Sequence, residues 1–246
     1  IKINIKKNNN ENLKIVSLLK NKKTKINSKE LSKYFQIDKK FFKDQEIIFG
    51  SNNQLSFNID KNTKVKNLKI KSNINFENLK FNYTSSKLKK RIPNYKDYII
   101  LNSNYLELDH NNNKTQIKAN GSYSFNDKFD NYKINILKKK GKYDFESSLE
   151  LKNNPITIEE IDLNKNKDTY SLVELKGSYI QNKDIKIENA IYSEGKNKIA
   201  ISNLKLSKDY KIKDIDSLEL NYLNKNKKIN FIKVLKNNNN YLLTGE

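Results

Sequence analysis

Few residues of this sequence have the type and spacing that catalysis or metal binding requires. The single histidine, His110, lies in the polar stretch LDHNNNK, where we expect a turn, and the chain has no cysteine. Protein zinc sites combine several cysteine, histidine or carboxylate ligands. The neighbouring pair Asp109–His110 therefore reads as part of a solvated turn, and we expect no metal site.

Two pairs of carboxylates are the remaining candidates for acid–base chemistry. Glu159 and Glu160 are adjacent, and in a strand adjacent side chains point to opposite faces, so the two would not cooperate unless the strand were bulged. Asp214 and Asp216 would share a face, but the lysines around them favour solvation. The sequence also has no phosphate-binding glycine loop and no nucleophile elbow. We therefore expect no enzyme and no cofactor.

The elements that would position such residues are short strands. Apolar residues make up 35% of the 246 residues and charged residues 31%, which is lean for a globular core. A sheet with one buried face needs an apolar residue only at every second position. From Leu55 onward the apolar residues alternate in this way, and turns rich in Asn, Lys, Asp and Gly separate the runs.

The alternating residues are also the candidate lining of any apolar binding surface. We select those that repeat most regularly: Leu68, Ile70, Ile74, Phe76, Phe81, Ile117, Tyr123, Phe125, Ile134, Ile136, Val173, Leu175, Ile185, Ile187, Ile199, Ile201, Leu204, Leu206, Leu218, Leu220, Ile229 and Phe231.

Residues 1–50 follow a mixed pattern. Ile1, Ile3 and Ile5 alternate as in a strand, whereas Leu13, Val16 and Leu19 recur at helical spacing. Ser28 is placed to cap a second short helix, with Leu31, Tyr34 and Phe35 on one face. We expect 1–50 to be a strand with a small helical insertion that covers the end of a sheet formed by 51–246.

Glycine and proline mark the expected irregularities of the strands. Gly121 and Gly177 follow alternating runs in IKANGSYSF and VELKGSYIQ, and Gly245 ends a third run. Glycine inside a strand commonly marks a bulge or bend. The stretch 85–97, which contains Pro93, is the expected irregular excursion, and Pro155 is placed to begin a strand.

The net charge of +21, from 49 basic and 28 acidic residues, permits a nucleic-acid partner. The lysines are dispersed along the chain, however, and lysine on the outer face of strands protects a sheet against aggregation. The aromatic residues keep the parity of the neighbouring Ile and Leu, which favours packing over base stacking. We expect no nucleic-acid partner, although a basic rod would be attracted to anionic membrane surfaces.

About fourteen strands in one sheet would extend roughly 65 Å. Water does not tolerate so long an apolar face, so either a second sheet covers it, as in a β-sandwich, or one sheet curls into a gutter with a hydrophobic groove. Acyl chains fit such a groove without specific polar contacts. The sequence therefore predicts a mainly β protein with a long antiparallel, curled sheet, and a β-sandwich is the alternative.

The pattern of short alternating strands and polar turns from about residue 55 to 246 resembles the AsmA-like proteins of Gram-negative envelopes, in particular the branch of the YhdP central domain. The resemblance lies in the stretches LKIKSNINFENLKFNY, IKANGSYSF, VELKGSYIQNKDIKIENAIYS and IDSLELNYLNKNKKINFIKVLKNNNNYLLTGE. It covers about three quarters of the chain and rests on patterns rather than on single residues.

This resemblance implies an inner-membrane-anchored periplasmic protein that carries phospholipid between the two membranes and serves envelope homeostasis. It implies phospholipid acyl chains as partners and a monomeric rod. The chain has no methionine, not even at position 1, and we expect it to be an internal piece whose anchor lies elsewhere. The alternatives that remain are a β-sandwich interaction or adhesin module and a basic nucleic-acid-binding protein.

Overall fold

The computed structural model describes all residues except 8–12, 36, 37, 39, 43, 127, 166, 167, 182, 224–227, 239 and 246. Strands hold 70% of the residues and helices 6%, so the chain is mainly β. None of the helices in the described part is long or apolar enough to cross a membrane.

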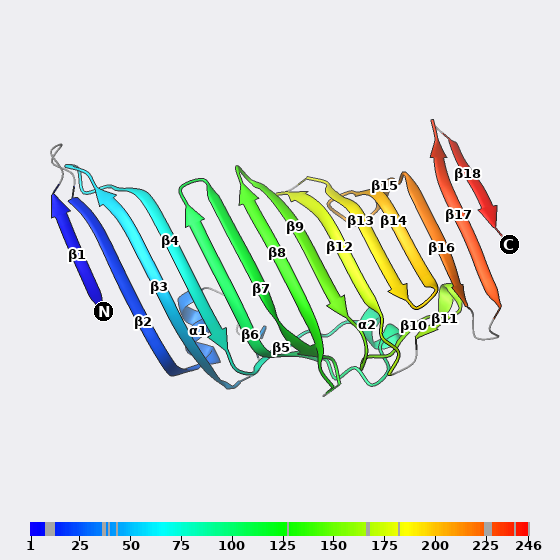
Figure 1. Ribbon diagram of the computed structural model, residues 1–246, viewed down its shortest axis with the longest axis horizontal. Coiled ribbons are helices and arrows are strands. Elements are labelled where there is room, and N and C mark those ends of the chain that lie inside the picture. The colour runs from blue at the N-terminus through cyan, green and yellow to red at the C-terminus, as the bar shows by residue number, and fades with distance from the viewer. Residues whose placement is uncertain are drawn as a thin grey trace.

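One antiparallel sheet of sixteen strands forms the body of the molecule (Figure 1). The strands of its main path follow one another in chain order, and β1 and β18 are its free edges. The path consists of β1 (Lys2–Lys7), β2 (Leu13–Asn27), β3 (Glu46–Ile59), β4 (Val65–Phe76), β6 (Tyr98–Asn111), β7 (Lys114–Ser124), β8 (Asp130–Lys139), β9 (Lys142–Glu150), β12 (Leu172–Ile180), β13 (Ile185–Glu194), β14 (Asn197–Leu206), β16 (Ser217–Leu223), β17 (Ile229–Asn237) and β18 (Asn240–Gly245).

The remaining elements are short and lie beside this path. They are α1 (Ser28–Phe35), β5 (Leu79–Asn82), α2 (Ser86–Arg91), β10 (Ile156–Ile158), the 3₁₀ turn η1 (Glu159–Ile161), β11 (Leu163–Lys165) and β15 (Ile212–Asp214). β5 and β15 extend the large sheet, while β10 and β11 form a separate hairpin. The single open sheet confirms the predicted long antiparallel sheet, and the described strands do not form the alternative sandwich.

Tight turns keep consecutive strands antiparallel. The β8–β9 turn has Lys140 and Gly141 at φ +48° and +76°, and the β13–β14 turn has Gly195 at φ +57°. Two-residue hairpins require such left-handed backbone, which glycine adopts without strain. Hairpins that are this short make each strand pair with the next one along the chain.

The predicted helix around residues 13–19 is wrong, because these residues belong to β2. Ile15 lies opposite Ile5 of β1 and Phe57 of β3, so hydrogen bonds to both neighbours favour the strand. Residues 13–19 also contain the alternation of Leu13, Ile15 and Leu19, which a strand can use as well as a helix can.

The predicted short helix at Ser28 is confirmed as α1. The Asn27 side chain accepts a hydrogen bond from the Lys29 backbone N–H at 2.8 Å. The Ser28 hydroxyl accepts a hydrogen bond from the Gln45 backbone N–H at 3.1 Å. The side chains of Leu31, Tyr34 and Phe35 lie outside the described residues.

The stretch expected to be irregular, 85–97, contains α2, whose Ser85 side chain accepts a hydrogen bond from Leu88 N–H at 3.3 Å. Pro155 directly precedes β10, as expected, and Pro93 lies in the turn after α2.

Two of the three glycines predicted to mark bulges lie at register shifts. Lys176 of β12 lies opposite Asn189, but Gly177 lies opposite Ile187, so Glu188 is an extra residue that makes a bulge. Gly121 faces a shift between Asn102 and Tyr105 of β6.

The third of these glycines, Gly245, lies opposite Ile232 in regular pairing. The expected bulge is therefore absent from the described pairing of β17 and β18.

We predict that Gly177→Ala lowers the free energy of unfolding by about 1–3 kcal/mol because the site is already full. A Cβ at this position would lie 2.3 Å from the Lys186 carbonyl oxygen and 2.8 Å from Cζ of Phe145. Urea denaturation followed by circular dichroism measures the change. Gly195→Asn is the control, since nothing lies within 4 Å of that Cβ and Asn tolerates positive φ. Equal stability of Gly177→Ala and the parent chain would contradict the prediction.

Candidate functional site: the apolar face of the sheet

The structure brings almost all of the candidate lining residues to one face of the sheet. Residues that lie directly opposite each other on neighbouring strands share a face, so the pairing register can be followed from strand to strand. One such row contains Ile74, Leu106, Ala119, Ile134, Ser147, Leu175, Ala190, Ile201, Leu218, Val234 and Leu243. We call the face that bears this row the apolar face and the other one the polar face.

A second row on the apolar face lies nearer the turns at the upper edge of Figure 1. It contains Leu108, Ile117, Ile136, Phe145, Gly177, Ile187 and Leu204. The bulge at Glu188 keeps Ile187 on this face despite its odd spacing from Ala190. The apolar side chains therefore continue across strands even where the register shifts.

Ile229 and Phe231 are the two candidates that the structure places on the polar face. Phe231 lies opposite Asn221 of β16, whereas Ile232 lies opposite Leu220. The sequence INFIKVL is apolar at both parities, so only the pairing with β16 decides which residues face the apolar side. Ile229 is 68% exposed.

Several residues of the apolar face are absent from the predicted lining. Tyr132, Tyr192, Ile232 and Val234 belong to it through their pairing with Leu149, Val173, Leu220 and Leu218. Tyr132 shares the parity of Ile134 and could have been found from that signal. The face on which Tyr192, Ile232 and Val234 lie is decided by how their strands pair with the neighbouring strands.

Two excursions cover part of the apolar face, and we call them together the cap. They are residues 83–97, which contain α2, and residues 151–171, which contain β10, η1 and β11. Leu151 is 3% exposed and packs with Tyr123 and Tyr132, and Leu163, 1% exposed, packs with Leu220 and Tyr222. The cap therefore buries the apolar face along the lower edge of the sheet in Figure 1.

The candidates fall into a covered and an uncovered group. Phe81 packs against Phe41 and Phe42 at centroid distances of 5.0 and 5.2 Å. Cap clusters include or pack against Tyr123, Phe125, Ile134, Val173, Ile199, Leu218 and Leu220. Leu204 lies outside these clusters but is buried as well, at 9% exposure. The remaining candidates of the apolar face are half-buried and lie outside the clusters, and we call them the uncovered strip: Leu68, Ile70, Ile74, Phe76, Ile117, Ile136, Leu175, Ile185, Ile187, Ile201 and Leu206.

Polar anchors hold the 151–171 excursion on the sheet. The buried Asp130 carboxylate accepts hydrogen bonds from the backbone N–H groups of Lys152, Asn153 and Asn154 at 2.9–3.1 Å, and from the Asn154 amide at 2.6 Å. The Tyr222 hydroxyl donates to the Ile161 carbonyl oxygen. These bonds fix the backbone of the excursion where its apolar residues meet the sheet.

Burial under the cap changes the ionisation of several side chains. Desolvation raises the pKa of Tyr123 and Tyr192, and it raises the pKa of Tyr95 to about 12. Burial lowers the pKa of Lys165, whose Nζ lies 3.3 Å from the Lys152 carbonyl oxygen. Each shift favours the neutral form of the side chain.

Ion pairs on the outer surface join the two excursions of the cap. Arg91 of α2 binds Glu160 through both guanidinium nitrogens, at 2.5 and 2.8 Å. Lys90 lies 3.1 Å from Glu159 and 3.8 Å from Glu160. The expectation that Glu159 and Glu160 point to opposite faces of a strand is wrong, because they lie in the 3₁₀ turn η1 and face the same cations.

The other polar candidates each have a local partner. His110 lies within β6, not in the expected turn, and its Nδ1 is 2.9 Å from the Thr115 hydroxyl. Asp214 binds Lys236 at 2.6 Å, and Asp216 accepts from Asn203 at 2.8 Å. Within the described ranges no three His, Cys, Asp or Glu side chains are placed to hold a metal ion.

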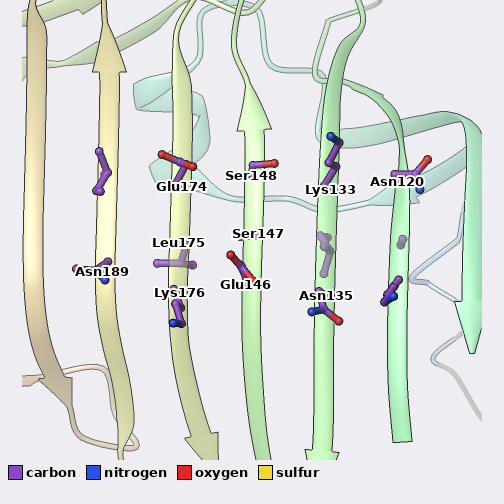
Figure 2. Close-up of a pocket in the computed structure, with 14 residues that line it drawn as sticks. Asn120, Lys133, Asn135, Glu146, Ser147, Ser148, Glu174, Leu175, Lys176 and Asn189 are labelled. Atoms are coloured by element: carbon purple, nitrogen blue, oxygen red, sulfur yellow. The ribbon is translucent and has the colours of Figure 1, made fainter. Parts of the chain in front are cut away.

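A hollow of about 510 Å³ lies on the polar face, so it is not the apolar groove that the sequence predicts. Figure 2 shows Glu174 and Lys176 on the near side of β12, while Leu175 between them lies behind the ribbon. Charged and amide residues make up most of its lining: Lys118, Asn120, Lys133, Asn135, Glu146, Glu174, Lys176 and Asn189. The candidates Ile134 and Leu175 also border it, together with Ala119, Ser147, Ser148 and Ile191. Because the charged side chains of the lining are of both signs, we expect water rather than an acyl chain to occupy the hollow.

We predict that Arg91 and Glu160 couple favourably in a double-mutant cycle with Arg91→Ala and Glu160→Ala, and that added salt reduces the coupling. Proteolysis at 83–97 and 151–171 is the more direct measurement, and both single variants should be cut faster there than the parent chain. Lys66→Ala is the control, because its partner Asp60 lies outside the cap. Unchanged cleavage in both cap variants would show that the ion pairs do not hold the cap.

Comparison with known proteins finds no family model, no curated protein and no solved structure that matches the chain.

Proposed function

We propose that this protein binds the acyl chains of phospholipids on its apolar face and passes them along the sheet, as part of lipid transport between the two membranes of a Gram-negative envelope. The observation that carries the proposal is the continuity of apolar side chains from β4 to β18, which the pairing register maintains through two register shifts, one in β6 and one in β13. A single protein core does not need a strip of this length.

The mechanism that we propose is passive. An acyl chain on the uncovered strip would be stabilised by roughly 0.8 kcal/mol for each buried CH₂ group, and no polar side chain has to recognise it. Neighbouring strands repeat every 4.8 Å or so, so a chain moving across the sheet meets similar surfaces at each step. The headgroup stays in water at the rim of the sheet.

The distribution of lysine argues against the nucleic-acid alternative. A single-strand binder needs cations and stacking rings on one surface. Here rings such as Phe76, Tyr123 and Phe145 lie on the apolar face, and lysines such as Lys118, Lys133 and Lys176 lie on the polar face. The open sheet likewise lacks the paired layers of a sandwich interaction module.

The cellular setting is supported by the resemblance to AsmA-like proteins alone. It supports a periplasmic location, anchoring in the inner membrane and action as a monomeric rod. These proposals are separate from acyl-chain binding, which rests on the apolar face.

We predict that phospholipid co-purifies with the chain and is lost when polar groups enter the uncovered strip. The test variant is Ile136→Asn with Ile187→Asn, two positions on the row through Phe145. Native mass spectrometry in detergent-free buffer, with lipid extraction of the same sample, measures the bound lipid.

The matched control is Leu137→Asn with Ile191→Asn, which makes the same change on the polar face of the same strands. It should retain lipid. A lipid-free parent chain that unfolds cooperatively as a monomer would contradict the proposal, as would equal loss of lipid in both double variants.

A further inference from the structure

We propose that the turns of the β6–β7 and β8–β9 hairpins form a docking surface for an anionic lipid bilayer. The surface consists of Lys114, Lys138, Lys139, Lys140 and Lys142, which we call the basic tip. Docking rests on charge and does not require the proposed lipid transport. If both hold, the uncovered strip opens toward the bilayer.

The register stacks like charges against each other at the basic tip. Lys139 lies directly opposite Lys114 on one side and Lys142 on the other. Like charges at directly opposite positions of a sheet repel. Lys140 adds a further charge in the turn, where φ is +48°. An external anionic surface would relieve this repulsion.

The basic tip has little internal neutralisation. Within the described part of the chain, Lys142 alone of the five has a carboxylate partner, Asp144 at 2.7 Å, which raises the pKa of Lys142. Lys138 lies over the Tyr143 ring, with Nζ 5.1 Å from the centroid.

Other loops at the same edge of the sheet carry their own acids. Asp60 pairs with Lys66 at 2.8 Å, and Asp184 pairs with Lys213 at 2.5 Å. The charge excess of the whole chain is dispersed, but at this tip five lysines share a single carboxylate partner, Asp144, among the described residues.

From the basic tip inward, the side chains change from lysine to tyrosine to apolar residues, which is the order expected at a membrane interface. Tyr143 and Tyr179, with centroids 6.0 Å apart, lie just inside the lysines on the apolar face. Ile136 and Phe145 follow one step further in. Tyrosine favours the headgroup level because it has an apolar ring and a polar hydroxyl. This continuity with an apolar strip favours a bilayer over a nucleic acid.

The position of the tip also agrees with docking at the uncovered end. The β6–β7 and β8–β9 turns lie along the upper edge of Figure 1, while α2, β10 and β11 of the cap lie along the lower edge. A bilayer at the basic tip would therefore meet the part of the apolar face that the cap leaves open.

The test is sedimentation of the whole chain with vesicles of phosphatidylcholine alone or with an added one-third of phosphatidylglycerol. We expect binding to the anionic vesicles only, weakened by added salt. Each lysine near an anionic surface raises partitioning by about fivefold. The variant Lys114→Gln, Lys138→Gln, Lys139→Gln, Lys140→Gln should therefore lower it by roughly 600-fold.

The matched control is Lys61→Gln, Lys64→Gln, Lys208→Gln, Lys211→Gln, which removes the same charge from other loops at the same edge. Circular dichroism and urea denaturation show that both variants are folded. Equal losses in the two variants would overturn the proposal, because attraction would then come from net charge alone. Equal binding to neutral vesicles, or tighter binding to DNA or free inorganic phosphate, would overturn it too.

A second readout locates the contact. The chain has no cysteine, so Asn113→Cys in the β6–β7 turn and Lys196→Cys in the β13–β14 turn each give one labelling site. An environment-sensitive dye at position 113 should shift to the blue with anionic vesicles, and one at position 196 should not. The reverse would overturn the docking surface. Loss of co-purifying lipid with intact vesicle binding would affect only the proposed transport.

Discussion

The constraint on which this structure depends is the alternation of side chains in a single antiparallel sheet. Every second residue of each strand faces the same side, and hydrogen-bonded neighbours must agree in register or their apolar residues separate. Here the agreement extends along a path of fourteen strands. Bulges at Ser103 and Glu188 absorb the extra residues, so that parity is restored after each interruption. The result is one apolar face and one polar face.

The apolar face has to be shielded from water, and the cap covers only part of it. Long apolar surfaces are unfavourable in water, and the excursions 83–97 and 151–171 bury one edge of the face under Leu151 and Leu163. Asp130 supplies the polar anchor for this cover, because its carboxylate satisfies several backbone donors that would otherwise be buried without partners. What the cap leaves open is the uncovered strip, and its apolar chemistry is the basis of the proposed acyl-chain binding.

The polar face and the turns carry the charged residues of the sheet, and their charges are arranged differently. Across the strands, Glu107 lies opposite Lys118 and Glu146 lies opposite Lys176, and such pairs of opposite charge stabilise a sheet. Lysines at the free edge β1 oppose pairing with other chains. Lysines also lie opposite each other at Lys6–Lys14 and Lys186–Lys205, but the basic tip gathers five of them around two neighbouring hairpin turns. A protein can tolerate that repulsion where an anionic partner compensates for it.

The amino-acid sequence by itself determined the fold class, the strand-rich course of the chain and nearly all residues of the apolar face. These follow from a period of two, which is a local property of each strand. Only the tertiary structure decided that Leu13–Asn27 is a strand, that Ile232 and Val234 face the apolar side in place of Ile229 and Phe231, and that Glu159 and Glu160 meet Arg91 and Lys90 in the cap. Each of these depends on pairing between segments, which a local pattern does not specify. The alternation of apolar residues can be recognised along each strand. Which strands share a face, and which part of that face the cap covers, depend on the pairing register and on packing between distant segments.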